Sequence, residues 1–388
     1  MNIGFQRIVV NICRMALFAT FVFSGLVKLI DPLGTAYKIH DYAVALHLEA
    51  WMPEDVATAL AVVLALLEFL IGIYFFFGMR RRFASYGALF LLVLFTPLTL
   101  WLAITHAVTD CGCFGDAVHL TGWQTFGKNI FALACACVVA YKGDLMPRFI
   151  SQSSQWIVSL YSILFGGMIA FTGLHDLPVF DFRPYHIGQN IPKAMEWPED
   201  PEQQPQILDF YMETPEEGDI TEAILTDTSY VFLLIAPNLA QADDSNIDRI
   251  NNLADYSKEH AYRFLCLTAS GQDDITRWQD LTGAEYPFAF TDELTLKTMI
   301  RSNPGLMLLH NGTVINKWSH NKLPTYEMLH APLQELPLAH PRREVFQRRI
   351  AKLILMYLVP LFLLTLLDRL FFGLLWAWRR HRNHPTEH

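Results

Sequence analysis

The stretch DCGCFGD at residues 110–116 places two cysteines, Cys111 and Cys113, one residue apart. The 388-residue chain has only six cysteines, so such a pair is a pronounced use of a rare residue. Gly112 lets the backbone turn tightly enough for the two sulfur atoms to meet. A disulfide in so small a ring is strained, and strain makes it easier to reduce and better suited to exchange than to permanent crosslinking. The spacing therefore predicts thiol-disulfide chemistry, with Cys111 and Cys113 as catalytic residues.

Two other interpretations of the pair stay open. The cysteines can shape a loop at the membrane edge without reacting, either as two thiols or as a structural disulfide. They can also bind a metal, because His106 and His119 flank them and would complete a set of two cysteines and two histidines. The spacing matches no established zinc pattern, so no metal site is predicted.

The segments that must position this loop are strongly apolar. The composition is 52% hydrophobic and 17% charged, against about 25% charged in soluble proteins. Six segments approach or exceed the length of a bilayer-spanning helix, near residues 8–30, 55–79, 83–107, 124–141, 155–174 and 350–377. The sequence predicts a membrane α-helical bundle, with the cysteine pair directly after the third span.

Basic residues between the spans predict the orientation. The connections on the side of the N-terminus carry six of them, Arg7, Arg80, Arg81, Arg82, Lys142 and Arg148, whereas residues 31–54 and 108–123 contain Lys38 alone. The positive-inside rule then places both termini in the cytoplasm and the cysteine loop in the periplasm of a bacterial inner membrane, where disulfides persist. Arginines on both sides of the last span leave that helix undecided by its own charges.

Polar residues within the spans are further candidates. Glu68 lies near the middle of the second span, where an ionisable group is a functional candidate and a structural ion pair is the alternative. Lys28, at the outer end of the first span, either extends its ammonium group to the interface or binds a partner. Trp123 is either an interfacial belt residue or a binding residue. Asp116 is either an interfacial charge or a member of a proton relay.

Cys135 and Cys137 form a second closely spaced pair, in the sequence ALACACVVA. On a helix, residues two apart point to nearly opposite sides, so these two cysteines cannot bridge each other. They are interpreted as small residues that pack between membrane helices.

The region between the fifth and sixth spans has a different character. Residues 176–340 contain 26 acidic and 10 basic residues, a net charge of −16, while the rest of the chain sums to +7. Such an acidic surface excludes nucleic acid as a partner. Apolar runs predict strands at 230–236 and 262–269, and helical patterns cover 245–260, opened by Ser245, and 273–283, ended by Gly283. Asn311-Gly312 predicts a tight hairpin within residues 306–318.

This order of elements resembles a thioredoxin fold of the membrane-tethered, TlpA-like branch. The matching positions are Pro287, Phe288, Asp292, Leu296, Lys297, Arg301, Pro304, Leu308, Asn311, Gly312, Val314 and Trp318. The resemblance implies that Pro304 is a cis-proline beside a client-binding position. The Cys-x-x-Cys of that fold is missing, because its place reads APNLAQADDSN, and Cys266 is expected to be a buried core thiol. The domain therefore resembles a thioredoxin-like binding domain without dithiol chemistry of its own.

The first 150 residues resemble the DoxX/MauE superfamily of four-helix membrane proteins. The matching positions are Gly25, Lys28, Asp31, Pro32, Glu68, Gly72, Cys111, Gly112, Cys113, Gly115, Asp116, Trp123 and Asn129. Members are associated with disulfide and respiratory redox chemistry, which implies quinone as a candidate cofactor and binding roles for Lys28, Asp116, Trp123 and Asn129. Several Bacteroidota proteins of this type resemble the whole arrangement, a bundle joined to a thioredoxin-like domain and a final anchor.

The expected organisation has four parts: a four-helix membrane domain at 1–150, a fifth span at 151–175, a periplasmic α/β domain at 176–345, and a last span with a basic tail at 346–388. Two functions remain. In the first, a thiol-disulfide oxidoreductase uses Cys111, Cys113 and Glu68, and the acidic domain binds a periplasmic client. In the second, the chain is a non-enzymatic envelope scaffold or accessory subunit that holds another inner-membrane protein.

Overall fold

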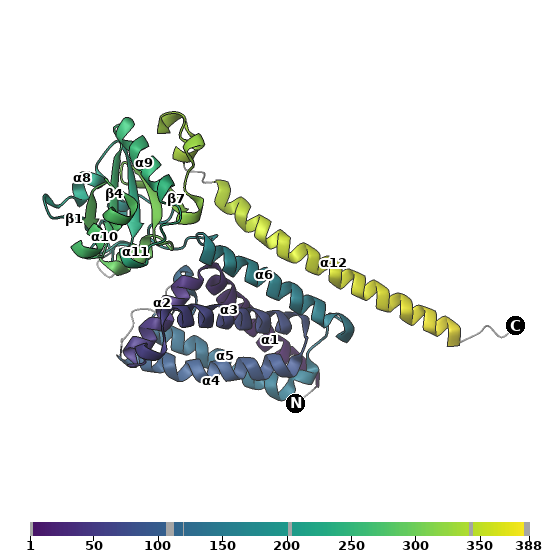
Figure 1. Ribbon diagram of the computed structural model, residues 1–388. Coiled ribbons are helices and arrows are strands. Elements are labelled where there is room, and N and C mark those ends of the chain that lie inside the picture. Colours follow the sequence, from purple (N-terminus) through teal and green to yellow (C-terminus); the bar gives the residue numbers. More distant parts are fainter. Residues whose placement is uncertain (1–2, 106–111, 119, 201–203, 341–343, 384–388) are drawn as a thin grey trace. The chain divides into compact units, whose positions relative to one another are not determined.

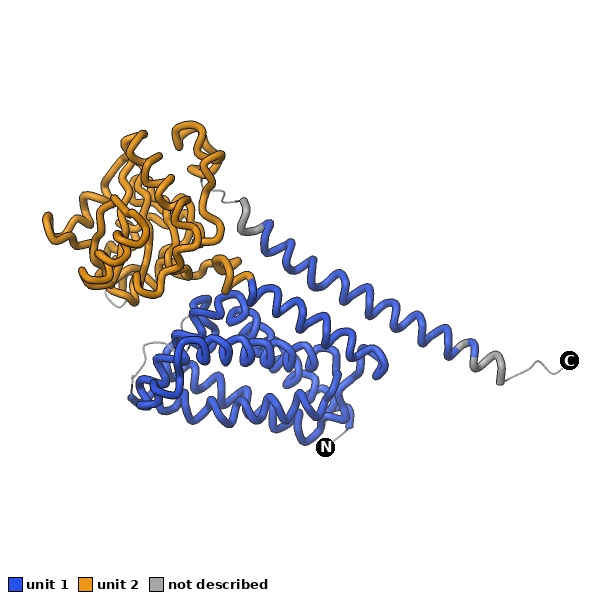
Figure 2. The backbone as a smooth tube through the Cα atoms, viewed as in Figure 1, with its two compact units in different colours: residues 1–171, 347–388 blue, residues 172–346 orange. Residues whose placement is uncertain are grey.

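The computed structural model describes residues 3–105, 112–118, 120–200, 204–340 and 344–383 (Figure 1). The chain divides into two compact units (Figure 2). Unit 1 comprises residues 1–171 together with 347–388, and unit 2 comprises residues 172–346.

Unit 1 is built from apolar helices. Within the described residues, six helices are long and apolar enough to cross a membrane, which confirms the six predicted spans: α1 (Ile3–Ile30), α3 (Glu54–Phe77), α4 (Arg81–Thr105), α5 (Gly122–Lys142), α6 (Gln155–His175) and α12 (Glu344–Asn383). Helix α1 packs against α3 and α5, and α4 packs against α5 and α3. These four helices form the bundle that carries the predicted site.

A helix that the sequence analysis did not predict, α2 (Pro32–Ala45), fills much of the segment expected to be a loop. The Asp31 side chain caps it by accepting a hydrogen bond from the Gly34 N–H at 2.9 Å, and Pro32 occupies the first turn. An Asp-Pro helix start is a recognised signal, but the segment is too polar to stand out by hydropathy. Its packing against α3 places it next to the bundle.

Hydrogen bonds within unit 1 define a basic end, formed by residues 78–82 and 142–154. Asp368 of α12 accepts hydrogen bonds from the Ser151 and Ser154 hydroxyls, each at 2.6 Å. Arg369 donates to the Arg148 and Phe149 carbonyls at 2.8 and 3.1 Å. The C-terminal part of α12, whose own charges left its direction undecided, therefore lies at the end that carries most of the basic loop residues.

Unit 2 is an α/β structure around one sheet. Its strands are β1 (Glu213–Thr214), β2 (Gly218–Asp219), β3 (Tyr230–Ala236), β4 (Arg263–Thr268), β5 (Phe288–Phe290), β6 (Gly305–His310) and β7 (Thr313–Ser319), in the order β2-β1-β5-β4-β3-β6-β7. Strands β3, β4 and β5 run parallel, and β6 and β7 are antiparallel to their neighbours. Alternate residues of the fully buried β3 enter two apolar clusters, one on each face of the sheet.

The helices of unit 2 are α7 (Ile191–Met195), α8 (Thr221–Leu225), α9 (Ile247–Glu259), α10 (Gln272–Thr282) and α11 (Glu293–Met299). The predicted strands, the end of α10 at Gly283 and the Asn311-Gly312 turn are confirmed, with φ of 49° and 65° at the two turn residues. The start of α9 was predicted too early. Ser245 hydrogen-bonds to the Asp243 carboxylate instead of capping the helix, so Asn246 is the N-cap residue.

Candidate functional site

A buried ion pair joins two of the predicted site residues. The Lys28 Nζ lies 2.7 Å from Oε2 and 2.8 Å from Oε1 of Glu68, although the residues are 40 positions apart in the chain. The two side chains are 7% and 6% exposed. The interpretation that Lys28 extends its ammonium group to the interface is therefore wrong, because its charge is neutralised inside the bundle.

Close contact between α1 and α3 makes this pair possible. A Cβ atom at Gly25 would lie 2.5 Å from the Phe69 backbone nitrogen, and one at Gly72 would lie 2.6 Å from a Val22 methyl group. Small residues of this kind let membrane helices approach until their backbones touch. The glycines are thus placed one position from Ser24 and four positions from Glu68, at the level of the ion pair.

Ser24 links the ion pair to the cysteine loop, and sequence reasoning did not identify it. Its Oγ lies 2.8 Å from Glu68 Oε2, 2.9 Å from Lys28 Nζ and 2.7 Å from the carbonyl oxygen of Cys113. Ser24 stands one helical turn before Lys28 on the same face of α1, so the i, i+4 spacing was the signal available in the sequence.

The described part of the cysteine loop, residues 112–118, is fastened to the bundle by further contacts. The Phe114 ring packs edge-on against Phe23, with the centroids 5.2 Å apart, and the Lys128 ammonium group lies 4.3 Å from its centroid. Gly112 has a φ of 65°, and a Cβ there would meet the Lys38 side chain at 3.0 Å. The half-buried Cys113 is therefore held against α1 by its own carbonyl and by the residue that follows it.

The Ser24 hydroxyl links the Glu68 carboxylate to the cysteine loop through its hydrogen bonds. A hydroxyl has one hydrogen to donate, and here it accepts from Lys28 while two acceptors, Glu68 Oε2 and the Cys113 carbonyl, compete for that hydrogen. If Glu68 takes up a proton, its O–H can donate to Ser24, and the Ser24 hydrogen then goes to the loop. We define Ser24, Lys28 and Glu68 as the charged cluster, a set that is hydrogen-bonded to the backbone of the cysteine loop.

The other predicted site residues of unit 1 have different surroundings. Trp123 is 59% exposed and packs against Phe126, and the buried Asn129 amide donates to the Thr99 hydroxyl at 3.2 Å. Asp116 is half-buried in the short turn at Gly115–Ala117 that follows Cys113. Among these three, only Asp116 is part of the described cysteine loop.

Some predicted residues lie outside the part of the chain that the structure describes. They are Cys111, which was predicted as catalytic, and the flanking His106, Asp110 and His119. The expected pairing of Cys111 with Cys113 and the alternative metal site therefore remain predictions.

A contact between cysteines was also missed by the sequence analysis. The buried Cys135 of α5 lies near Cys13 of α1, whereas Cys137 is exposed. The opposite environments of Cys135 and Cys137 agree with their predicted positions on opposite sides of the helix. The partner, Cys13, was unpredictable because it belongs to another span.

In unit 2, the place expected to bind a client is closed by the chain itself. The Asn303–Pro304 peptide bond is cis, as the resemblance implied, and Pro304 is buried. The Asp243 N–H donates to the Asn303 carbonyl at 2.9 Å, and the Asn303 amide donates to the Asn238 carbonyl at 2.7 Å. The loop after β3 thus covers the proline with polar contacts.

The single cysteine of unit 2 is unsuited to thiol chemistry. Cys266 lies in the middle of β4, is fully buried, and belongs to the apolar cluster on one face of the sheet. Burial raises the pKa of its thiol above the ordinary value, so the reactive thiolate is disfavoured. The expectation that Cys266 is a core thiol is confirmed.

Comparison with known families concerns unit 1. Residues 6–142 match the family model described as Methylamine utilisation protein MauE, a range that runs from the first turns of α1 to the end of α5. Together with the apolar helices, this match makes the chain an integral membrane protein with a MauE-like N-terminal part. Searches of the curated proteins and of the solved structures gave no match.

Proposed function

We propose that the protein is a thiol-disulfide oxidoreductase of the bacterial inner membrane, with the cysteine loop and a thioredoxin-like unit 2 on the periplasmic side. The single observation that carries the proposal is the position of Ser24, whose hydroxyl lies within hydrogen-bonding distance of both Glu68 and the Cys113 carbonyl. A buried ionisable pair inside a membrane is expensive and is a functional candidate by default. Its link to a cysteine loop suits a reaction that moves protons together with electrons.

The proposed reaction balances as a disulfide exchange. One client thiolate attacks a sulfur of the Cys111–Cys113 disulfide, the loop S–S bond breaks, and a mixed disulfide forms. The second client thiolate attacks the mixed disulfide, releasing an oxidised client and a reduced loop that has gained two electrons and two protons. A membrane quinone would supply the oxidant for the reduced loop, taking up its two electrons and two protons, one of the protons by way of Glu68.

The charged cluster has two roles in this scheme. Its hydrogen bond to the Cys113 carbonyl holds the reacting loop against α1, and Glu68 accepts a proton that the reduced loop gives up on reoxidation. Lys28 keeps Glu68 from being an isolated buried charge, which would otherwise cost several kcal/mol. Ser24 and Lys28 are therefore positioning residues, and Glu68 is the proposed proton acceptor.

Trapping of mixed disulfides in cells tests the proposal. Replacing Cys111 or Cys113 by Ser should abolish client oxidation, and only one of the two single variants should accumulate a client adduct, because one loop sulfur bonds to the client while the other is the leaving thiolate. Cys113 is expected to be the residue that forms the adduct. Cys137→Ser, which removes an exposed cysteine outside the loop, is the matched control and should behave as the parent.

Two further variants separate a chemical role of the loop and Glu68 from a structural one. Glu68→Gln should slow reoxidation of the loop and shift its pH profile, while client adducts still form. Full client oxidation in the Cys111→Ser/Cys113→Ser double variant would remove redox chemistry from the protein.

The second candidate function is a non-enzymatic envelope scaffold. The observation that favours it is the chemistry of unit 2, in which Cys266 is buried and the loop after β3 contains no cysteine. In this version unit 2 binds a client or envelope protein and unit 1 holds another inner-membrane protein. Normal complex formation by the double cysteine variant, with no adduct from either single variant, would support the scaffold.

A further inference from the structure

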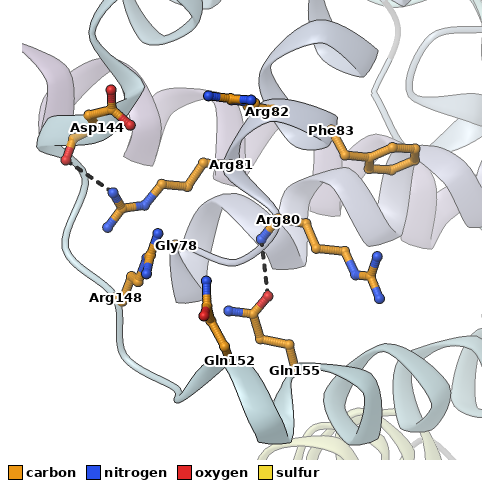
Figure 3. Close-up of a pocket in the computed structure, with 9 residues that line it drawn as sticks. All are labelled: Gly78, Arg80, Arg81, Arg82, Phe83, Asp144, Arg148, Gln152 and Gln155. Atoms are coloured by element: carbon orange, nitrogen blue, oxygen red, sulfur yellow. Dashed lines mark hydrogen bonds between the residues drawn. The ribbon is translucent and has the colours of Figure 1, made fainter.

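The basic end of unit 1 contains a pocket that the proposed redox function does not use (Figure 3). Its volume is about 370 Å³, and its lining includes four arginines but only one carboxylate, that of Asp144. The arginines are Arg80, Arg81, Arg82 and Arg148, from the start of α4 and the connection between α5 and α6. A cavity with this excess of positive charge is suited to an anion.

Of the four arginines, Arg81 uses its guanidinium group to hold the fold of the chain. Arg81 donates to the Asp144 carbonyl at 3.0 Å and to the Met146 carbonyl, while its Nε is buried without a hydrogen-bond partner. Within the described residues, the guanidinium groups of Arg80, Arg82 and Arg148 form no ion pair. Three arginine charges at the pocket are therefore not neutralised by the chain.

Hydrogen-bond donors gather on one side of the pocket, and the Arg80 side chain extends away from them toward Phe83 (Figure 3). Arg81 and Arg148 lie next to each other, close enough for their charges to repel, and the Gln152 side chain lies beside them (Figure 3). Gln155 accepts a hydrogen bond from the Arg80 N–H at 3.4 Å, which ties the first turn of α6 to the residue before α4. Paired guanidinium groups and amides match the several oxygen acceptors of a phosphate.

The position of the pocket favours a lipid as the source of that phosphate. It lies at the ends of two apolar spans, and the aromatic residues Phe83 and Trp156 beside it are 52% and 59% exposed. Basic pockets at such depths between membrane helices bind anionic headgroups. We propose that this pocket binds the phosphate group of an anionic membrane lipid, with Arg148 and Gln152 as contacts.

The test measures lipid binding to the purified full-length chain by native mass spectrometry. Phosphatidylglycerol should bind at least about tenfold more tightly than phosphatidylcholine, because both carry a phosphate but the choline ammonium group adds a positive charge beside the arginines. The double variant Arg148→Gln/Gln152→Ala should lose this preference. Arg7→Gln removes an exposed charge outside the pocket and should keep it. Thermal unfolding of each variant verifies that the chain is folded.

Three outcomes would overturn the proposal. The first is an unchanged preference for phosphatidylglycerol in the folded double variant. The second is an equal loss in Arg7→Gln, which would reveal a general charge effect. The third is binding of inorganic phosphate by the parent chain, abolished in the double variant, without any preference between the lipids. That result would assign the pocket to a soluble phosphate.

Discussion

Inside a membrane, a lysine or a glutamate is costly when it stands alone and tolerable when it is paired. The Lys28–Glu68 pair meets this condition at 2.7 Å, and Ser24 supplies a further hydrogen-bond partner. The three residues are consequently interdependent. Removing one charge leaves the other buried without compensation, whereas removing both leaves an apolar contact between α1 and α3.

Lys28→Met should lower the free energy of unfolding by about 3 to 5 kcal/mol, because Glu68 then remains buried without a counter-charge. Lys28→Met/Glu68→Leu should recover a large part of this loss. Thermal unfolding of the detergent-solubilised chain measures both, and Lys352→Met at an exposed lysine of α12 is the control. If the double variant were as unstable as Lys28→Met, the unpaired charge of Glu68 would not be the cause of the lost stability.

A second buried charge network lies in unit 2. The Asp181 carboxylate lies 2.7 Å from Lys317 Nζ and 2.8 Å from Arg183 Nε. Burial alone would raise the pKa of Asp181, but the charges of Lys317 and Arg183 outweigh it and hold the pKa well below its ordinary value. This network fastens the segment before α7 to β7.

The lowered pKa of Asp181 predicts a pH dependence with a definite sign. The folded state keeps Asp181 ionised at pH values where the unfolded chain binds a proton, so the stabilisation is present above about pH 4 and is lost as the pH falls further. Asp181→Asn should remove this contribution and leave Lys317 unpaired. Hydrogen exchange of β7 between pH 3 and 6, corrected for the intrinsic exchange rate, should show a smaller acid-induced loss of protection in the variant than in the parent. An identical loss in both would contradict the assignment.

How far these sites could be predicted differs between residues. Glu68 and Lys28 stood out because ionisable residues are rare inside apolar spans. The pairing of the two residues could not be predicted, because hydropathy does not report how two helices are rotated relative to each other. Ser24 carried no compositional signal, since serine is common at contacts between membrane helices. A polar residue one turn from a buried charge is the pattern that would have identified it.

At the scale of elements, α1 uses different faces for different neighbours. Gly25 and Lys28 contact α3, whereas Cys13 lies near Cys135 of α5. The spans, the strands and the hairpin were predictable because hydropathy and turn chemistry are local. Helix α2 was not predictable because it is too polar to stand out by hydropathy, and the start of α9 was not because the Asp243 carboxylate binds the Ser245 hydroxyl.

The contact between α1 and α5 predicts a selective crosslink. Mild oxidation of membranes should join Cys13 to Cys135, because Cys135 is buried in the bundle where α5 packs against α1. It should not join Cys13 to Cys137, which is exposed on the far side of the same helix. Mass spectrometry of the crosslinked peptides measures the yield, and Cys135→Ser is the control. A comparable Cys13–Cys137 yield in that control would contradict the packing of α5.

On the scale of the whole molecule, charge distribution and hydrogen bonding both separate a basic end of unit 1 from the end that holds Cys113. The basic residues of the connections gather at the end where Asp368 and Arg369 of α12 are also bonded, and Cys113 is bonded to the opposite end of α1. Under the positive-inside rule, this distribution supports our proposal that the cysteine loop and the acidic unit 2 lie on the outer side. The sequence alone predicted this for four spans, and the contacts of α12 extend the argument to the last.

Thiol labelling of spheroplasts tests that orientation. In a chain with Cys113 as its only cysteine, an impermeant maleimide should label intact spheroplasts. Ser153→Cys, an exposed position at the basic end, should be labelled only after lysis, and Asp248→Cys, an exposed position of unit 2, should be labelled before it. The reason is that a charged reagent cannot cross the bilayer, so labelling reports the side directly. Labelling of Cys113 only after lysis would place the loop in the cytoplasm, where disulfides are reduced, and would remove the basis of the redox proposal.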